Sequence, residues 1–111
     1  MNSAETLKLN KDFKRLYYRG ESIVTRSVVL YVQKNRLGRN RLGLTCGKSV
    51  GKANKRNRAK RLMRESYRLI HPELKEGYDI VIIARTRILG KNCLEVMRDV
   101  HYGFSKLGMI K

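Results

Sequence analysis

The hydrophobic residues of this 111-residue chain follow two different spacings. In segments 22–33, 41–46 and 78–85, β-branched, aliphatic and aromatic residues follow one another without a helical period, which predicts β-strands. Positions 80–84 are apolar throughout, so this strand should be buried on both faces in the middle of a sheet. The polar turn 34–40 contains glycine and asparagine, and it predicts that the first two strands pair as an antiparallel hairpin.

Other segments repeat apolar residues every three to four positions, which predicts amphipathic helices. A short helix should begin at Asn10 or Lys11 and end at Gly20. A longer basic helix should follow the strand 41–46, with Asn54 as its N-cap, and should end before Pro72.

A last amphipathic helix should begin after Asn92, which has Glu95 three positions later as in a capping box, and should end near Gly108. The resulting order is helix, strand, strand, helix, strand, helix. This order predicts a single α+β domain over residues 1–111 with a small mixed sheet, including a loose lead-in over residues 1–8.

The basic helix is expected to have two chemically different faces. One narrow stripe is apolar or small, as expected of a buried face, and consists of Ala59, Leu62, Met63, Ser66 and Ile70. The opposite face carries Asn57, Arg61, Arg64 and Arg68, with Arg58 and Lys60 on the flanks. Glu65 is the only acid in this helix, whereas a solvated face normally mixes charges because like charges at i,i+4 repel. The unbalanced face therefore predicts an anionic partner.

Composition points to the same partner. The chain has 26 Lys and Arg against 9 Asp and Glu, a net charge of +17. Between Lys48 and Arg68 there are nine basic residues and one acid, so +8 of this charge lies in one short segment. Concentrated positive charge favours nucleic acid. An anionic membrane is the weaker alternative, because the apolar stripe is narrow and the strands need it for their core.

Other chemistry finds little support. Segment 43–49 resembles a phosphate loop but has three residues between its glycines, where the Walker motif needs four. His71 and His101 have no partner at metal-ligand or triad spacing. Cys46 and Cys93 form no metal or redox pair and should be reduced, buried thiols in a cytosolic protein. No signal peptide or membrane span is predicted, and no residue argues for catalysis by the polypeptide.

Aromatic residues could add a second RNA-binding element. Single-stranded RNA is bound by basic side chains together with aromatic rings on which unstacked bases lie. Phe13, Tyr17, Tyr18 and Tyr31 could supply such rings, but core packing explains Phe13 and Tyr17 equally well.

At Arg56-Asn57-Arg58-x-Lys60-Arg61-x-x-Arg64 the sequence resembles the signature helix of the bacterial ribonuclease P protein subunit. The resemblance extends over roughly residues 5–86 and includes the blocks Leu7-x-x-Asn10-x-Asp12-Phe13, Arg26-x-x-Val29-Leu30-Tyr31, Arg41-Leu42-Gly43-Leu44 and the strand 80–85. The final helix matches only in amphipathic character.

The resemblance implies a compact α-β sandwich similar to ribosomal protein S5 domain 2, with a left-handed β-α-β crossover. It also implies a cytoplasmic bacterial protein that binds a catalytic RNA and the 5′ leader of precursor tRNA. The RNA would hold Mg²⁺ and remove the leader, and the protein would act as a non-catalytic cofactor of this endonuclease. No membrane or small-molecule partner is implied.

Residue by residue, the resemblance implies two groups of site residues. The RNA-facing helix would contribute Arg56, Asn57, Arg58, Lys60, Arg61 and Arg64, to which the helical pattern adds Arg68. The leader cleft would contain Phe13, Tyr17, Tyr31, Arg26 and Lys48. Asn54 stands where the family is usually apolar, and Tyr17 stands where phenylalanine is common. A ribosomal or other structural RNA-binding protein of similar fold, without a cleavage role, is the alternative.

Overall fold

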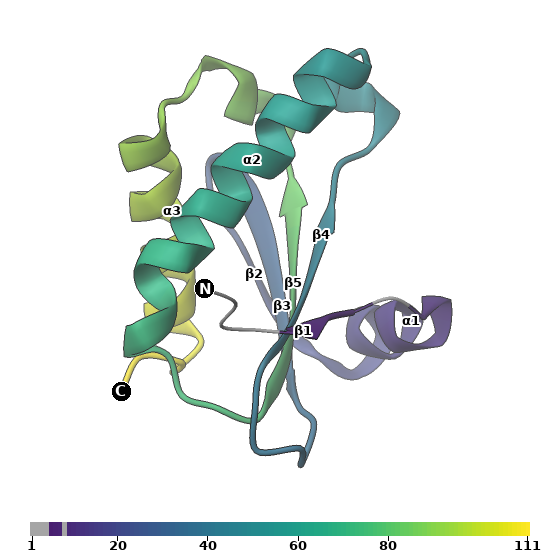
Figure 1. Cartoon of the computed structure of the whole chain (residues 1–111), viewed down its shortest axis with the longest axis vertical. Coiled ribbons are helices and arrows are strands. Elements are labelled where there is room, and N and C mark those ends of the chain that lie inside the picture. The colour runs from purple at the N-terminus through teal and green to yellow at the C-terminus, as the bar shows by residue number, and fades with distance from the viewer. Residues whose placement is uncertain (1–4, 8) are drawn as a thin grey trace.

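The computed structural model describes residues 5–7 and 9–111 (Figure 1). The strands are β1 (Glu5–Thr6), β2 (Glu21–Val24), β3 (Val28–Lys34), β4 (Arg41–Thr45) and β5 (Tyr78–Ala84). The α-helices are α1 (Asn10–Arg19), α2 (Ala53–Ile70) and α3 (Cys93–Lys106). Short 3-10 helices η1 (Lys48–Val50), η2 (His71–Glu73) and η3 (Thr86–Gly90) connect them. The predicted α+β class is confirmed.

The strands form one mixed sheet in the order β1-β4-β5-β3-β2. β5 lies in the middle, as its continuous apolar sequence predicts, parallel to β4 and antiparallel to β3. Tyr31 of β3, Val81 of β5 and Gly43 of β4 are paired in one row across the sheet. Because side chains alternate along a strand, these three positions share one face.

The two faces of the sheet are covered to different extents. Helices α2 and α3 cover one face, and their apolar sides enclose the main core with Leu30, Ile80 and Ile82. Helix α1 lies on the other face, where Leu16 packs with Val81 in a smaller cluster. β5 therefore contributes alternate residues to two separate cores.

A glycine allows α3 to approach the sheet closely. Gly103 lies on the buried side of α3, and a β-carbon at this position would stand 2.5 Å from Cδ1 of Leu30. No side chain fits at this distance, so Gly103 fixes the spacing between α3 and β3.

Segment 22–33, which the pattern predicts as one strand, forms two. β2 and β3 pair as an antiparallel hairpin around a turn at residues 25–27. The Thr25 hydroxyl donates a hydrogen bond to the carbonyl oxygen of Val28 (2.8 Å), which closes the turn. The sequence pattern missed it because the turn contains neither glycine nor proline.

The predicted hairpin between the first two strand segments is also wrong. β3 and β4 do not pair with each other, because β5 lies between them and pairs with both. The reason is burial: β5 is apolar on both faces, and both faces are covered at the centre of the sheet. The segment between β3 and β4 therefore bridges the width of one strand.

The connection from β4 through α2 to β5 is left-handed. Both strands rise toward the top of Figure 1, α2 descends in front of the sheet, and β5 lies to the left of β4. Nearly all crossovers between parallel strands have the opposite hand. The crossover implied by the family resemblance is therefore present.

The predicted loose lead-in over residues 1–8 is wrong for residues 5–7. β1 pairs in parallel with β4, the amide of Leu7 donates to the carbonyl of Leu42 (2.9 Å), and the Leu7 side chain is buried. The rest of that prediction, for residues 1–4 and 8, lies outside the described residues.

The two long helices begin differently. Asn54 does not cap α2: Lys52 takes the N-cap position, and the Asn54 side chain accepts from the next amide, that of Lys55. The capping box of α3 is confirmed, since Asn92 accepts from the Glu95 amide (2.9 Å) and Glu95 accepts from the Asn92 amide (3.1 Å).

Two further predictions concern the thiols and the membrane. Cys46 and Cys93 are both free, but they are half-buried rather than fully buried. Among the described residues, no helix is long and apolar enough to span a membrane.

Candidate RNA interface

The two-faced character of α2 is confirmed. Ala59, Met63, Ser66 and Ile70 are fully buried against the sheet and α3, and Leu62 is half-buried at the edge of this stripe. The hydroxyl of Ser66 donates to the carbonyl of Leu62 (2.7 Å), which satisfies a polar group inside the core. The stripe also includes Tyr67, which the pattern did not predict.

The basic residues of α2 divide into two groups by exposure. Lys55, Arg58, Arg61, Arg64 and Arg68 are exposed on the helix, together with the neutral Asn57. Arg56 and Lys60 are half-buried on one flank. Burial raises the pKa of the Cys46 thiol, and the charges of Lys60 and Arg56 partly offset this rise. These two cations therefore lie near the residue that follows β4, on the flank nearest the sheet.

Arg68 differs from the other arginines of the outer surface. Its guanidinium forms a two-point ion pair with the carboxylate of Glu65, and a hydrogen bond from Arg68 lowers the pKa of Glu65. No such carboxylate partner is found for Arg61 or Arg64 among the described residues. Arg61 and Arg64, like Arg58, are therefore available to a phosphate backbone.

Three of the five predicted cleft residues form one aromatic row. The ring centroids of Phe13 and Tyr17 are 6.4 Å apart, and those of Tyr17 and Tyr31 are 5.1 Å apart with the planes at 71°. Edge-to-face pairs at such distances are favourable. Tyr17 is 42% exposed, while Phe13 and Tyr31 are half-buried. The row therefore combines packing with accessible aromatic surface.

A glycine sets the depth of this row. Phe13 lies over Gly43, where an added β-carbon would stand 2.7 Å from Cζ of the ring. The Phe13 ring thus occupies the space that any side chain at position 43 would need.

Helix α1 leaves part of its sheet face open. Beyond Tyr31 on the same face lie Val29 and Ile83, which are only half-buried, and Val24, which is 61% exposed. An apolar surface bordered by an aromatic row suits unstacked bases.

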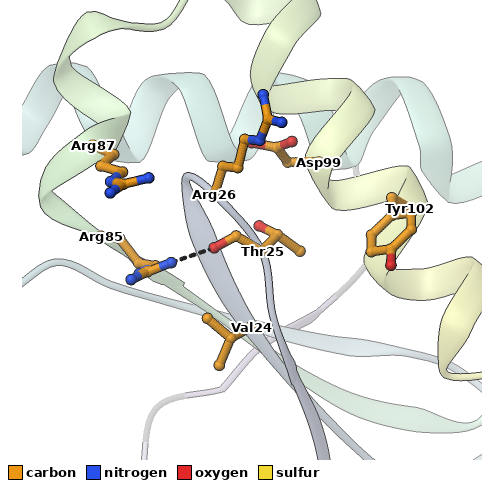
Figure 2. A pocket seen from close by; sticks show the side chains of 7 residues that line it. All are labelled: Val24, Thr25, Arg26, Arg85, Arg87, Asp99 and Tyr102. Atoms are coloured by element: carbon orange, nitrogen blue, oxygen red, sulfur yellow. Dashed lines mark hydrogen bonds between the residues drawn. The ribbon is translucent and has the colours of Figure 1, made fainter.

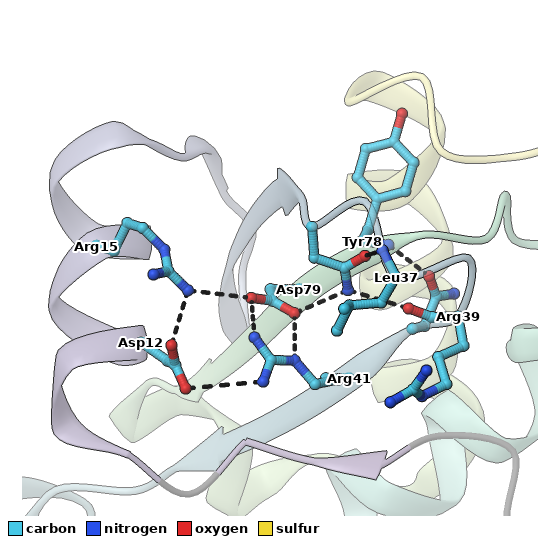
Figure 3. A network of polar contacts seen from close by, with 9 residues as sticks. Asp12, Arg15, Leu37, Arg39, Arg41, Tyr78 and Asp79 are labelled. Atoms are coloured by element: carbon cyan, nitrogen blue, oxygen red, sulfur yellow. Dashed lines mark hydrogen bonds and ion pairs between the residues drawn. The ribbon is translucent and has the colours of Figure 1, made fainter.

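An ion-pair network holds α1 against the sheet (Figure 3). Arg41 of β4 binds the Asp79 carboxylate with two hydrogen bonds, Nε–Oδ1 at 2.8 Å and Nη2–Oδ2 at 2.7 Å. Arg15 of α1 binds Asp12 (2.7 Å) and approaches Asp79 (3.7 Å), and Arg41 approaches Asp12 (3.8 Å). Asp12 and Asp79 are both buried, so the network joins α1 to two strands in a site with little water.

The pKa of Asp79 is affected in both directions. Burial raises it, but hydrogen bonds from Arg41 and Asn35 and the charges of Arg41 and Arg15 outweigh burial and lower it overall. Asp79 therefore prefers to be charged in the folded protein.

The other two predicted cleft residues lie apart from the aromatic row. Arg26 is in the turn before Val28, which pairs with the last residue of β5, and Lys48 follows β4 in η1. Both are exposed at the end of the sheet where β4 and β5 finish. The structure therefore separates an aromatic row from a basic end of the same sheet.

Sequence reasoning missed two groups of residues. Arg85 and Arg87 lie at this basic end with Arg26, where they line a common cavity. The second group consists of Arg15, Arg41 and Asp79, which join Asp12 in the ion-pair network that holds α1 against the sheet. Two arginines separated by one residue, directly after a buried strand, were a usable signal, whereas the network links residues up to 67 positions apart and has no local signal. No group of three or more His, Cys, Asp or Glu suited to a metal ion occurs within the described part of the chain.

The chain matches the family model described as Ribonuclease P over residues 1–108. It is 42% identical over 106 residues to the ribonuclease P protein component of Clostridium acetobutylicum, covering 94% of this chain and 89% of that protein. It is 46% identical over 87 residues to the corresponding protein of Natranaerobius thermophilus, covering 78% and 76%.

Solved structures show the same fold. The RNase P protein of Staphylococcus aureus superposes with a TM-score of 0.87 at 28% identity, covering 97% of this chain and 99% of that one. The RNase P protein from Thermotoga maritima superposes with a TM-score of 0.79 at 29% identity, covering 88% and 93%.

Proposed function

Because the chain belongs to the bacterial ribonuclease P protein family, we propose that it is the protein subunit of a ribonuclease P ribonucleoprotein. In this proposal it binds the catalytic RNA and the 5′ leader of precursor tRNA, and it assists removal of the leader by endonucleolytic cleavage. The family membership supports a role within an endoribonuclease complex that contains RNA, in the bacterial cytoplasm where precursor tRNA is made.

The observation that carries the proposal is the outer surface of α2. Arg61 and Arg64 project from a helix whose opposite side is packed in the core, so the backbone that carries them is held in place. Cations held in this way neutralise phosphates and release counterions on binding. The RNA-facing set remains the predicted one: Arg56, Asn57, Arg58, Lys60, Arg61, Arg64 and Arg68.

The second element of the proposal is the leader cleft. Phe13, Tyr17 and Tyr31 would stack bases of the single-stranded leader, and Arg26 and Lys48 would bind its phosphates farther along the sheet. The exposed edge of Tyr17 and the open sheet face beside Tyr31 support this assignment.

We assign no catalytic residue to the polypeptide. Mg²⁺ would be held mainly by the partner RNA and would activate the attacking water there. The contribution of this chain is charge neutralisation and positioning, because its basic surfaces bring two RNA molecules together that would otherwise repel each other.

The proposal is tested by adding the purified protein to a ribonuclease P RNA at a low Mg²⁺ concentration at which the RNA alone is inactive. Correct 5′ cleavage of precursor tRNA is the expected result. A folded double variant, Arg61→Gln with Arg64→Gln, should restore much less cleavage at the same protein concentration. If the wild-type protein binds the RNA but does not restore cleavage, the chain is a structural RNA-binding protein instead.

A further inference from the structure

A cavity of about 600 Å³ opens at the basic end of the sheet, between the β2–β3 turn, the end of β5 with η3, and α3 (Figure 2). Its charged lining consists of Arg26, Arg85, Arg87 and Asp99. Three cations and one anion give the lining a net charge of +2. The size is that of a small-molecule or nucleotide site.

Two of the three guanidinium groups are available for a ligand. Arg85 is engaged, because its Nη1 donates to the carbonyl of Thr25 and holds the turn against β5. Arg26 and Arg87 are exposed, and within the described residues neither forms an ion pair. The Asp99 carboxylate accepts a hydrogen bond from the hydroxyl of Ser27 (2.6 Å), and within the described residues it forms no ion pair with Arg26 or Arg87.

The cavity also has an aromatic wall. Tyr102 of α3 lines it with a ring that is 53% exposed, and the ammonium group of Lys106 lies 5.6 Å from the ring centroid. An exposed ring beside guanidinium groups is the combination that binds a nucleotide of single-stranded RNA, with the base stacked and the phosphates paired.

The cavity continues the open sheet face. Val24 lines the cavity and pairs with Val29, which lies two residues from Tyr31 on the same face. At about 3.3 Å per residue, the five positions from Tyr31 to Arg26 cover roughly 17 Å, which a few nucleotides of single strand can span.

We propose that Arg26, Arg87 and Tyr102 form a nucleotide subsite, in which the two cations bind the phosphates on either side of one nucleotide and Tyr102 stacks on its base. A net charge of +2 matches two phosphodiester groups. The proposal rests on the proposed function, and it adds a site on α3, the helix that the motif resemblance does not reach. The single-stranded RNA has two possible sources, the precursor leader or the catalytic RNA.

The test uses the reconstituted holoenzyme and precursors whose leaders lengthen one nucleotide at a time. We expect Tyr102→Leu to lower the affinity about tenfold for precursors whose leaders reach the cavity but not for precursors with shorter leaders. Tyr102→Phe should retain the wild-type affinity for both. The double variant Arg26→Gln with Arg87→Gln should reduce the slope of log affinity against log salt by about 0.7 for each phosphate that is no longer neutralised. Arg98→Gln, an exposed arginine of α3 outside the cavity, is the matched control.

The outcomes identify the source. A loss confined to long leaders assigns the subsite to the leader, and an equal loss in binding of the protein to catalytic RNA alone assigns it to that RNA. Losses no larger than those of Arg98→Gln in both measurements would overturn the subsite. Substitution of Tyr31 by leucine in the same series tests the aromatic row separately, so failure of the cleft and failure of the subsite can be distinguished. Thermal unfolding of each variant verifies the fold.

Discussion

The two faces of the sheet differ in what holds their functional side chains. On one face, the arginines of α2 extend into solvent from a helix that is fixed by a large apolar core. On the other, the rings of α1 are placed by a small apolar cluster together with a buried ion-pair network. Charge acts over distance and tolerates movement, whereas stacking needs rings at a defined spacing. The first surface should therefore depend on charge, and the second on geometry.

The largest effect is expected from Arg41→Met. This change leaves Asp12 and Asp79 buried with Arg15 as the remaining cation of the network in Figure 3, and removing one partner of a buried ion pair typically costs about 3–5 kcal/mol. Denaturant unfolding measures the loss. Binding to long-leader precursors should weaken more than binding to catalytic RNA. Equal weakening of both would show that the network does not act specifically on α1.

The next largest effect is expected from Gly43→Ala. The added methyl group would displace the Phe13 ring, and overpacking of this kind costs about 1–3 kcal/mol. Leader-dependent affinity should fall, while the salt dependence of catalytic-RNA binding stays unchanged. Gly90→Ala is the control, because nothing lies within 4 Å of a β-carbon at that position. If Gly43→Ala is less stable but binds long-leader precursors as tightly as the wild type, the position of the Phe13 ring does not determine leader binding.

On the α2 face, Arg64→Gln and Arg68→Gln form a matched pair. Arg64→Gln should weaken binding to catalytic RNA about fivefold and lower the salt slope by about 1. Arg68→Gln should have a smaller effect, because Glu65 already balances that charge. Filter binding over a range of salt concentrations distinguishes them. Neither change should alter the unfolding midpoint, and a reversed order of the two effects would contradict the assignment of available cations.

The smallest effect is expected from pH, because it concerns one carboxyl group among nine acids. The folded state lowers the pKa of Asp79, so the unfolded state binds more protons in the acidic range. The stabilisation is fully present above the unfolded pKa, about 4, and is lost as pH falls through the lower folded value. The difference in unfolding free energy between wild type and Asp79→Asn should therefore begin to shrink below about pH 5 and should continue to shrink as pH falls through the lowered folded pKa. If the difference does not change with pH, the charge of Asp79 does not contribute to the free energy of unfolding.

The sequence allowed the helices and the central strand to be predicted, because local periodicity and burial determine them. The alternation of Ala59, Met63 and Ile70 with arginines gave the orientation of α2, and the pairing of Asn92 with Glu95 gave the start of α3. Strand pairing was predicted wrongly, since adjacent segments were assumed to be neighbours. β5, which follows α2 in the sequence, takes the central position between β3 and β4.

The candidate site was predictable to a similar degree. The α2 residues and the aromatic row were identified from spacing and from the family motif, although their binding roles remain predictions. The cavity at the basic end was not foreseen, because it brings together Thr25, Arg85 and Asp99 from three separate segments. Side chains that meet only through tertiary folding leave no periodic pattern in the chain.

The left-handed connection determines which face of the sheet stays accessible to a ligand. With β4 and β5 kept in place, a crossover of the usual hand would put α2 on the side of the sheet that carries α1. The bulk of that helix would then exclude any extended chain from the surface beside Tyr31. In the proposed function, the unusual chirality thus separates two docking events in space, so that a large folded RNA and a flexible strand would occupy one small protein at the same time.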